Sequence, residues 1–182
     1  MKMLWPTLVP LVLLGLAATS LVAQWDRPRK KLIEYGWDVP YPDFVRQHIR
    51  EMESRPFDGI IFRLREFNHV FDTRAWQEAD LAAQLDDLRH IEWGTFTDNF
   101  LCVYAANNWG MDWFNDQQWQ TIAHNMRLTA QAAREGGCVG ICFDFEPYGE
   151  NPWEYADAVR PFAEVAAQVR KRGAEFMRAI QD

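Results

Sequence analysis

Four short apolar runs, each followed by a longer amphipathic stretch, constrain the fold of this 182-residue chain more than any other feature. The apolar runs predict strands over 31–38, 58–64, 100–106 and 138–146. The spacing of apolar residues between and after them predicts helices over 42–54, 75–91, 117–135 and 153–180, the last with its start signal at Asn151. Strands that alternate with helices form right-handed crossovers and lie parallel in one sheet. We therefore expect an α/β fold built from βα repeats.

The length of these units matches that of a TIM (β/α)8 barrel, in which eight units occupy roughly 250 residues. Four units fit between residues 24 and 182, so the sequence predicts the N-terminal half of such a barrel as an incomplete catalytic domain. A complete open sheet of four or five strands is the alternative. An open half leaves strand edges without partners, and we expect these edges to promote self-association of a lone copy.

The first 23 residues have the pattern of a secretory signal peptide. Lys2 provides a positive start, an apolar run extends from Leu8 to Val22, and Ala23 is a small residue suited to the cleavage position. We therefore expect an exported protein, either secreted or periplasmic. The alternative is an uncleaved anchor that holds the chain to a membrane, because the run approaches the roughly 20 residues that a span requires.

Composition and charge narrow the class of partner. The chain is 48% hydrophobic, which predicts a packed domain rather than disorder. Its formal net charge is -7, and it has no basic cluster beyond residues 27–31, so we expect no nucleic-acid partner. The sequence contains neither zinc-ligand spacing nor a glycine-rich phosphate loop. We therefore expect neither a metal nor a cofactor.

The three cysteines carry little information at this stage. Cys138 and Cys142 lie about 13 Å apart along one predicted strand, which is too far for a disulfide between them. Cys102 lies in the preceding predicted strand and could pair with one of them. We favour the interpretation that all three are buried free thiols.

Two carboxylates, Asp144 and Glu146, end the fourth predicted strand. Side chains alternate along a strand, so these acids share one face with Gly140 and Cys142, and the opposite face is apolar. Burying unpartnered carboxylates costs several kcal/mol, so we expect both acids to face a cavity. An ion pair with Arg63 on the second strand is the alternative for this pair.

The segment Val139–Glu146 resembles the strand-four signature of chitinase-like family 18 glycoside hydrolases, D-G-hydrophobic-D-hydrophobic-D-x-E. The matching residues are Gly140, Ile141, Phe143, Asp144 and Glu146, while Val139 and Cys142 replace the first two acids. The resemblance covers eight residues and implies that Glu146 is the general acid and that Asp144 orients the acetamido group of the substrate. In that family the acetamido group itself acts as the nucleophile.

The same segment also resembles the Glu-Pro ending of strand four in the large barrel clan of retaining glycosidases. Phe145 replaces the asparagine that usually precedes the glutamate in that clan. This second resemblance again implies that Glu146 is the acid/base, with a strand-seven carboxylate as the nucleophile. Both resemblances agree on Glu146.

Further candidates follow the predicted strands, at the end where active sites of barrels lie. Aromatic rings in these loops offer flat faces on which sugars stack, and polar groups can bind hydroxyls. The candidate substrate-binding residues are Trp37, Asp38, Asn107, Trp109, Trp113 and Tyr148. For Asp38 a helix-capping role is the alternative.

These observations predict an exported glycoside hydrolase, or a fragment of one, with Glu146 as the general acid and a carbohydrate as the substrate. One alternative is a non-catalytic glycan-binding or cell-surface protein on a degenerate barrel. Another is a barrel enzyme in which Asp144 and Glu146 bind a divalent cation. The sequence leaves the sugar and its linkage open.

Overall fold

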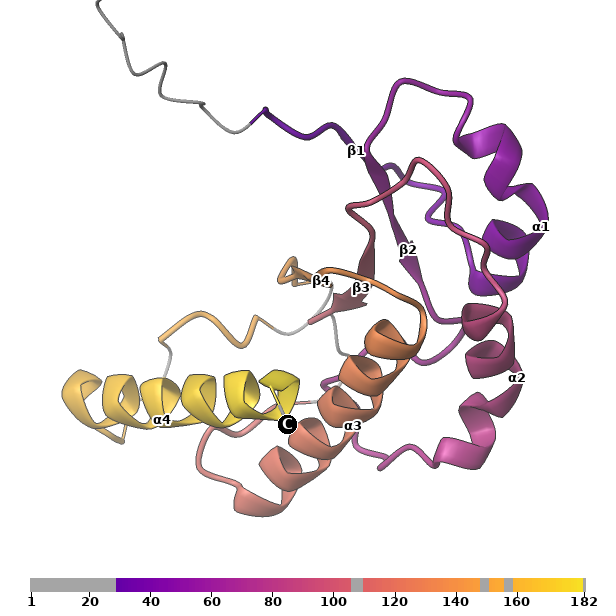
Figure 1. Cartoon of the computed structure of the whole chain (residues 1–182). Coiled ribbons are helices and arrows are strands. Elements are labelled where there is room, and N and C mark those ends of the chain that lie inside the picture. The colour runs from indigo at the N-terminus through magenta and orange to yellow at the C-terminus, as the bar shows by residue number, and fades with distance from the viewer. Residues whose placement is uncertain (1–28, 106–109, 148–150, 156–158, 182) are drawn as a thin grey trace, which may run out of the picture. The chain divides into compact units, whose positions relative to one another are not determined.

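The computed structural model describes residues 29–105, 110–147, 151–155 and 159–181 (Figure 1). The compact βα unit begins at Lys31. The predicted signal peptide, residues 1–23, lies outside the described residues. Within the described ranges, no helix is both long enough and apolar enough to cross a membrane.

Strands and helices alternate along the described chain. The strands are β1 (Ile33–Glu34), β2 (Gly59–Arg63), β3 (Phe100–Tyr104) and β4 (Gly140–Asp144), and the helices are α1 (Pro42–Met52), α2 (Glu78–Arg89), α3 (Asp116–Glu135) and α4 (Phe162–Gln181). The strands form one parallel sheet in the order β1-β2-β3-β4. The predicted α/β fold of parallel βα repeats is confirmed, and its consecutive strand order is consistent with half of a TIM-barrel-like arrangement.

Helices α1, α2 and α3 follow one another along one face of the sheet, and α4 packs beside α3 (Figure 1). Ile60 and Phe62 of β2, with Leu101 and Val103 of β3, are buried in the core that these helices share. Residues between them in the strands point the other way, because side chains alternate along a strand. The face away from the helices therefore carries the polar residues of β3 and β4.

Strand β1 is shorter than the sequence predicted, whereas helix α3 ends where it was predicted to end. Strand β1 pairs with β2 through two residues only, Ile33 and Glu34, and the chain bends at residues 37–38 instead of remaining a strand to Asp38. Helix α3 ends at Glu135, and Gly137 takes the left-handed conformation with φ of 68°, which glycine adopts without steric cost. The predicted end of this helix at Glu135 is confirmed.

Helix α4 starts at Phe162, so the predicted start at Asn151 is wrong. Asn151 forms a turn instead, because its side chain accepts a hydrogen bond from the Trp153 N–H at 3.1 Å. Pro161 lacks an N–H and cannot lie inside a helix without breaking a hydrogen bond, but its carbonyl accepts the first bonds of α4, from Glu164 and Val165. The proline, rather than the asparagine, sets the start of this helix.

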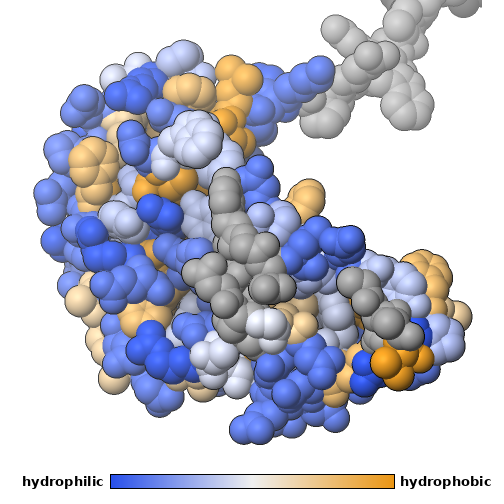
Figure 2. Space-filling view, turned by 180° about the vertical axis from the view of Figure 1, so that it is seen from behind, coloured by the Kyte–Doolittle hydropathy of each residue, from blue (hydrophilic) through white to orange (hydrophobic). Residues whose placement is uncertain are grey.

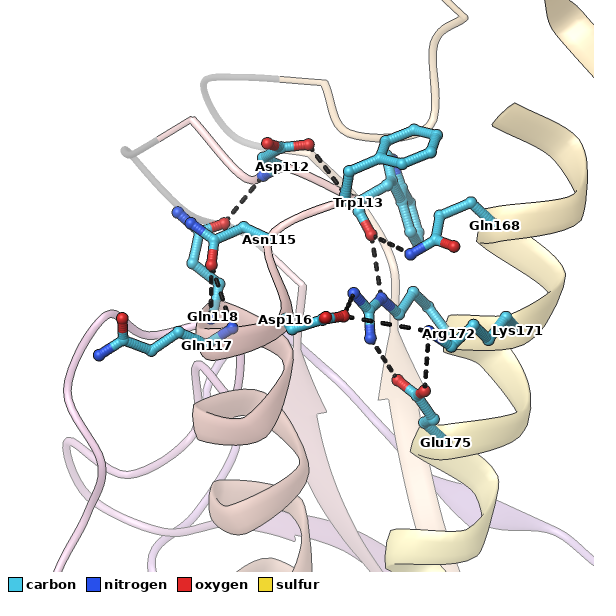
Figure 3. A network of polar contacts seen from close by, with 11 residues as sticks. Asp112, Trp113, Asn115, Asp116, Gln117, Gln118, Gln168, Lys171, Arg172 and Glu175 are labelled. Atoms are coloured by element: carbon cyan, nitrogen blue, oxygen red, sulfur yellow. Dashed lines mark hydrogen bonds and ion pairs between the residues drawn. The ribbon is translucent and has the colours of Figure 1, made fainter. Parts of the chain in front are cut away.

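Arg172 joins α4 to the start of α3 and to the loop after β3 (Figure 3). Its buried guanidinium donates to the Trp113 carbonyl at 2.9 Å, to the Glu175 carboxylate at 2.8 Å and to Asp116. Gln168 donates to the same Trp113 carbonyl at 2.8 Å. The Arg172 guanidinium lowers the pKa of Asp116 below its ordinary value. These contacts fix the backbone of Trp113 between α3 and α4.

Candidate functional site

A hollow of about 610 Å³, which we call the acid hollow, lies beside the carboxyl ends of β3 and β4. Asp144 and Glu146 both line it, and Tyr35 and Trp37 contribute to it from the segment after β1. This is the end of a parallel sheet where barrel enzymes place their catalytic side chains. The structure therefore brings together both acids and one of the aromatic residues that the sequence predicted.

Two hydrogen bonds hold the Asp144 carboxylate in place. The Tyr35 hydroxyl donates to Oδ2 at 3.0 Å, and the backbone N–H of Glu146 donates to Oδ1 at 3.1 Å. Partial burial, the neighbouring Cys102 thiol and the bond to Asp144 raise the pKa of Tyr35 above its ordinary value. The phenol consequently stays protonated at neutral pH and remains a donor. Asp144 is thus a positioned acceptor at the edge of the hollow.

Glu146 lies just beyond the end of β4, where its side chain is exposed. Pro147 follows it, and a proline cannot donate the next ladder hydrogen bond, so regular strand pairing ends here. The intervening Phe145 is 65% exposed, whereas Phe143 packs against the core. The apolar side chains predicted for this segment are therefore packed against the core within β4, but not beyond its end. Glu146 lines the open hollow at the rim, where a ligand can reach its carboxyl group.

Trp37 and Asp38, although adjacent, have different surroundings. Trp37 is 95% exposed and lines the hollow that contains the two acids. Asp38 lines a neighbouring hollow of about 520 Å³, together with Glu34, and is absent from the lining of the acid hollow. The N-cap residue of α1 is Tyr41 and makes no side-chain cap, so Asp38 does not cap that helix. Trp37 is thus better placed than Asp38 to contact a ligand that binds to Asp144 and Glu146.

Trp113 lies in a third hollow, of about 670 Å³, rather than beside the two acids. Its indole N–H donates to the Pro152 carbonyl at 3.0 Å, and its ring stacks on Trp119 with centroids 5.1 Å apart. These contacts tie the loop after β3 to the loop after β4. The other three predicted substrate-binding residues, Asn107, Trp109 and Tyr148, lie outside the described residues.

We call this third hollow the aromatic groove, defined by Trp113, Phe114, Trp153, Tyr155 and Phe162. Hydrophobic surface gathers where α4 begins, beside this groove (Figure 2). The indole of Trp153 donates to the Phe145 carbonyl at 2.7 Å, so the groove is linked to the segment that carries the acids. The arrangement offers several ring faces to a ligand.

Arg63 does not form the ion pair that was the alternative for the acids. Its guanidinium donates to the Tyr41 hydroxyl at 3.2 Å and lies 5.2 Å from the Tyr41 ring centroid and 5.7 Å from that of Tyr104. Within the described part of the chain, no ion pair joins Arg63 to Asp144 or Glu146. Arg63 therefore does not hold either acid in the hollow.

Tyr35, Tyr104 and Cys142 also line the hollow, although the sequence did not single out any of them as a ligand contact. A signal for Tyr35 was present, because Tyr35, Trp37 and Val39 alternate along the chain and all three line the hollow. Glu34, which precedes Tyr35, instead pairs with Arg55 at 3.1 Å. Cys142 also carried a signal, because alternation places it on the same face of the strand as Asp144. Tyr104 depends on the pairing of β3 with β4, which periodicity does not reveal.

Comparisons of the chain with protein-family models, with curated proteins and with solved structures gave no match. Among the side chains that the structure describes, no three histidines, cysteines, aspartates or glutamates are grouped so as to hold a metal ion. Functional inference for this chain therefore depends on the geometry of the acid hollow and of the aromatic groove.

Proposed function

We propose that the chain is an exported carbohydrate-active protein that cleaves glycosidic bonds, with Glu146 as the proton donor. The observation that carries this proposal is the shared hollow, in which both acids and an exposed tryptophan ring meet beside the carboxyl ends of parallel strands. Paired carboxyl groups beside a ring surface suit the binding and cleavage of a sugar. Export is proposed from the pattern of residues 1–23.

Each residue has a distinct role in this proposal. The Glu146 carboxylic acid transfers its proton to the glycosidic oxygen as the bond from that oxygen to the anomeric carbon breaks. Asp144, held by the Tyr35 hydroxyl, accepts a hydrogen bond from a polar N–H or O–H group of the sugar. Trp37 offers a ring face for stacking. The resemblance to family 18 implies that an acetamido oxygen of the substrate attacks the anomeric carbon.

A second candidate function is glycan binding without cleavage, and the aromatic groove favours it. The groove is about 670 Å³ and presents tryptophan, tyrosine and phenylalanine rings, but its lining does not include Asp144 or Glu146. A sugar chain held there by stacking needs no acid. In this candidate the acid hollow is not a catalytic site.

An assay with the full chain separates the two candidates. We expect saturable release of chromophore from aryl glycosides that carry a 2-acetamido group, and slower release from glycosides that lack it. Calorimetry with oligosaccharides of the same sugars provides the binding measurement. Binding without turnover contradicts the hydrolase proposal and supports the second candidate. An absence of both binding and turnover contradicts both candidates.

A further inference from the structure

Cys102 and Cys142 are directly opposite each other in neighbouring strands. They are register partners of the β3–β4 pair, on the face of the sheet away from the helices. Neighbouring strands lie about 4.8 Å apart, and a disulfide tolerates Cα separations of about 4.4 to 6.8 Å. Cys102, Cys138 and Cys142 are all free thiols in this structure. A disulfide can therefore join Cys102 and Cys142 with little movement of the backbone.

The two paired thiols differ in access from outside. Cys142 is half-buried and lines the acid hollow. Cys102 is only 1% exposed, and its thiol interacts with the side chains of Tyr35 and Tyr104. A small oxidant in the acid hollow therefore reaches Cys142 first. Cys102 can then react only with the oxidised form of Cys142.

The two thiols also differ in acidity. A hydrogen bond from Cys102 lowers the pKa of Cys142 below its ordinary value, although burial and the nearby Asp144 act in the opposite direction. The same bond and burial raise the pKa of Cys102 well above its ordinary value. Tyr35, which burial above all keeps protonated, and Tyr104, whose pKa burial raises to about 12, also lie on this face. Arg63 of β2 is the register partner of Cys102, and Glu146 lines the same hollow. Cys142 is thus the more acidic of the two thiols, and the thiolate is the reactive form.

We propose that Cys142 is an oxidant-reactive thiol and that Cys102 converts its oxidised form into a disulfide across β3 and β4, on the floor of the acid hollow. This inference is independent of the proposed function, because it requires no sugar and no proton donor. It assigns a modification site to a pair of residues that the cleavage of a glycoside does not use.

The reaction with hydrogen peroxide has two steps. The Cys142 thiolate attacks one peroxide oxygen, the O–O bond breaks, and Cys142 becomes a sulfenic acid while the departing hydroxide takes up a proton to form water. The Cys102 sulfur then attacks the Cys142 sulfur, the S–O bond breaks, and the leaving hydroxide takes the Cys102 proton as a second water. The two thiols lose two electrons in total, and the peroxide gains them.

The chain contains its own control, because Cys138 lies on the same segment of chain but in different surroundings. Burial raises the pKa of Cys138 to about 12, and the acid hollow does not include it. With iodoacetamide at neutral pH, we expect Cys142 to be alkylated at least about tenfold faster than Cys138, since alkylation follows the thiolate fraction and access. Peptide mass spectrometry at timed intervals measures both rates in the wild-type protein.

Treatment with hydrogen peroxide, followed by denaturation and alkylation, tests the disulfide. We expect a Cys102–Cys142 linkage within one chain, with Cys138 still reduced. In the Cys102→Ser variant, dimedone is expected to trap a sulfenic acid on Cys142, and Cys138→Ser is expected to oxidise as the wild type does. Equal alkylation of Cys138 and Cys142, or a peroxide-treated wild type without the linkage, overturns the proposal. The wild-type measurements decide even if a variant does not fold.

Discussion

Replacing Glu146 with glutamine is expected to lower the rate of glycoside hydrolysis by about a hundredfold to ten-thousandfold, the usual contribution of a general acid. Glutamine keeps the size of the side chain but has no carboxyl proton to transfer. Glu146 is exposed and lies two residues beyond the end of β4, so we expect the variant to unfold at nearly the same denaturant concentration as the wild type. The measurement is kcat/KM on the chromogenic glycoside that the wild type cleaves fastest.

Glu92→Gln is a matched control for this variant. The Glu92 side chain is 86% exposed and pairs with Arg50 at 3.5 Å, on a part of the surface that does not line the acid hollow. We expect it to keep the wild-type rate. If Glu146→Gln also keeps that rate, Glu146 is not the proton donor.

Replacing Gly59 with alanine is expected to lower the free energy of unfolding by about 3 kcal/mol or more. A Cβ atom at Gly59 would lie 2.0 Å from the carbonyl oxygen of Asp98 and 2.4 Å from its carbonyl carbon. These are backbone atoms, and the Asp98 N–H donates to the Asp58 carbonyl at 3.1 Å, so the segment cannot swing away as a side chain could. The steric clash therefore distorts the sheet where β2 begins. Chemical denaturation followed by circular dichroism measures the loss.

Gly173→Ala serves as the control for this substitution. Gly173 lies inside α4, and an added Cβ there meets no atom within 4 Å. Alanine in a helix interior is favoured over glycine by about 1 kcal/mol, so we expect this variant to be as stable as the wild type or more so. A Gly59→Ala protein that unfolds at the same denaturant concentration as the wild type contradicts the close packing of β2 on the Asp98 segment.

The sequence predicted the repeating elements well, because the position of each depends on its own residues. Three helices were predicted within about three residues of their bounds, a margin ordinary for element ends. The α4 start was wrong because Asn151 and Pro152 suit a turn as well as a helix start, and only tertiary structure decides between them. The predicted length of β1 was wrong because the length of an edge strand depends on how many of its residues pair with the neighbouring strand, here only two.

The site was predictable where side-chain alternation alone determines it. Asp144 lies in the hollow because it follows Gly140 and Cys142 on one face of a strand. Contacts between distant segments were not predictable, such as the hydrogen bond that Tyr35 donates to Asp144 across the sheet. The register that brings Cys102 opposite Cys142 is also such a contact, because no local pattern fixes which residues of two strands face each other.

The central claim is that a sugar binds in the acid hollow, and an NMR titration tests it most directly. An oligosaccharide of N-acetylglucosamine is added to the isotope-labelled Glu146→Gln protein, which should bind it without cleaving it. We predict that the signals that shift with saturation are those of the Trp37 indole and of the amides of Tyr35 and residue 146. Shifts confined to the Trp153 indole and the Tyr155 amide in the aromatic groove, or no shifts at all, would contradict the claim.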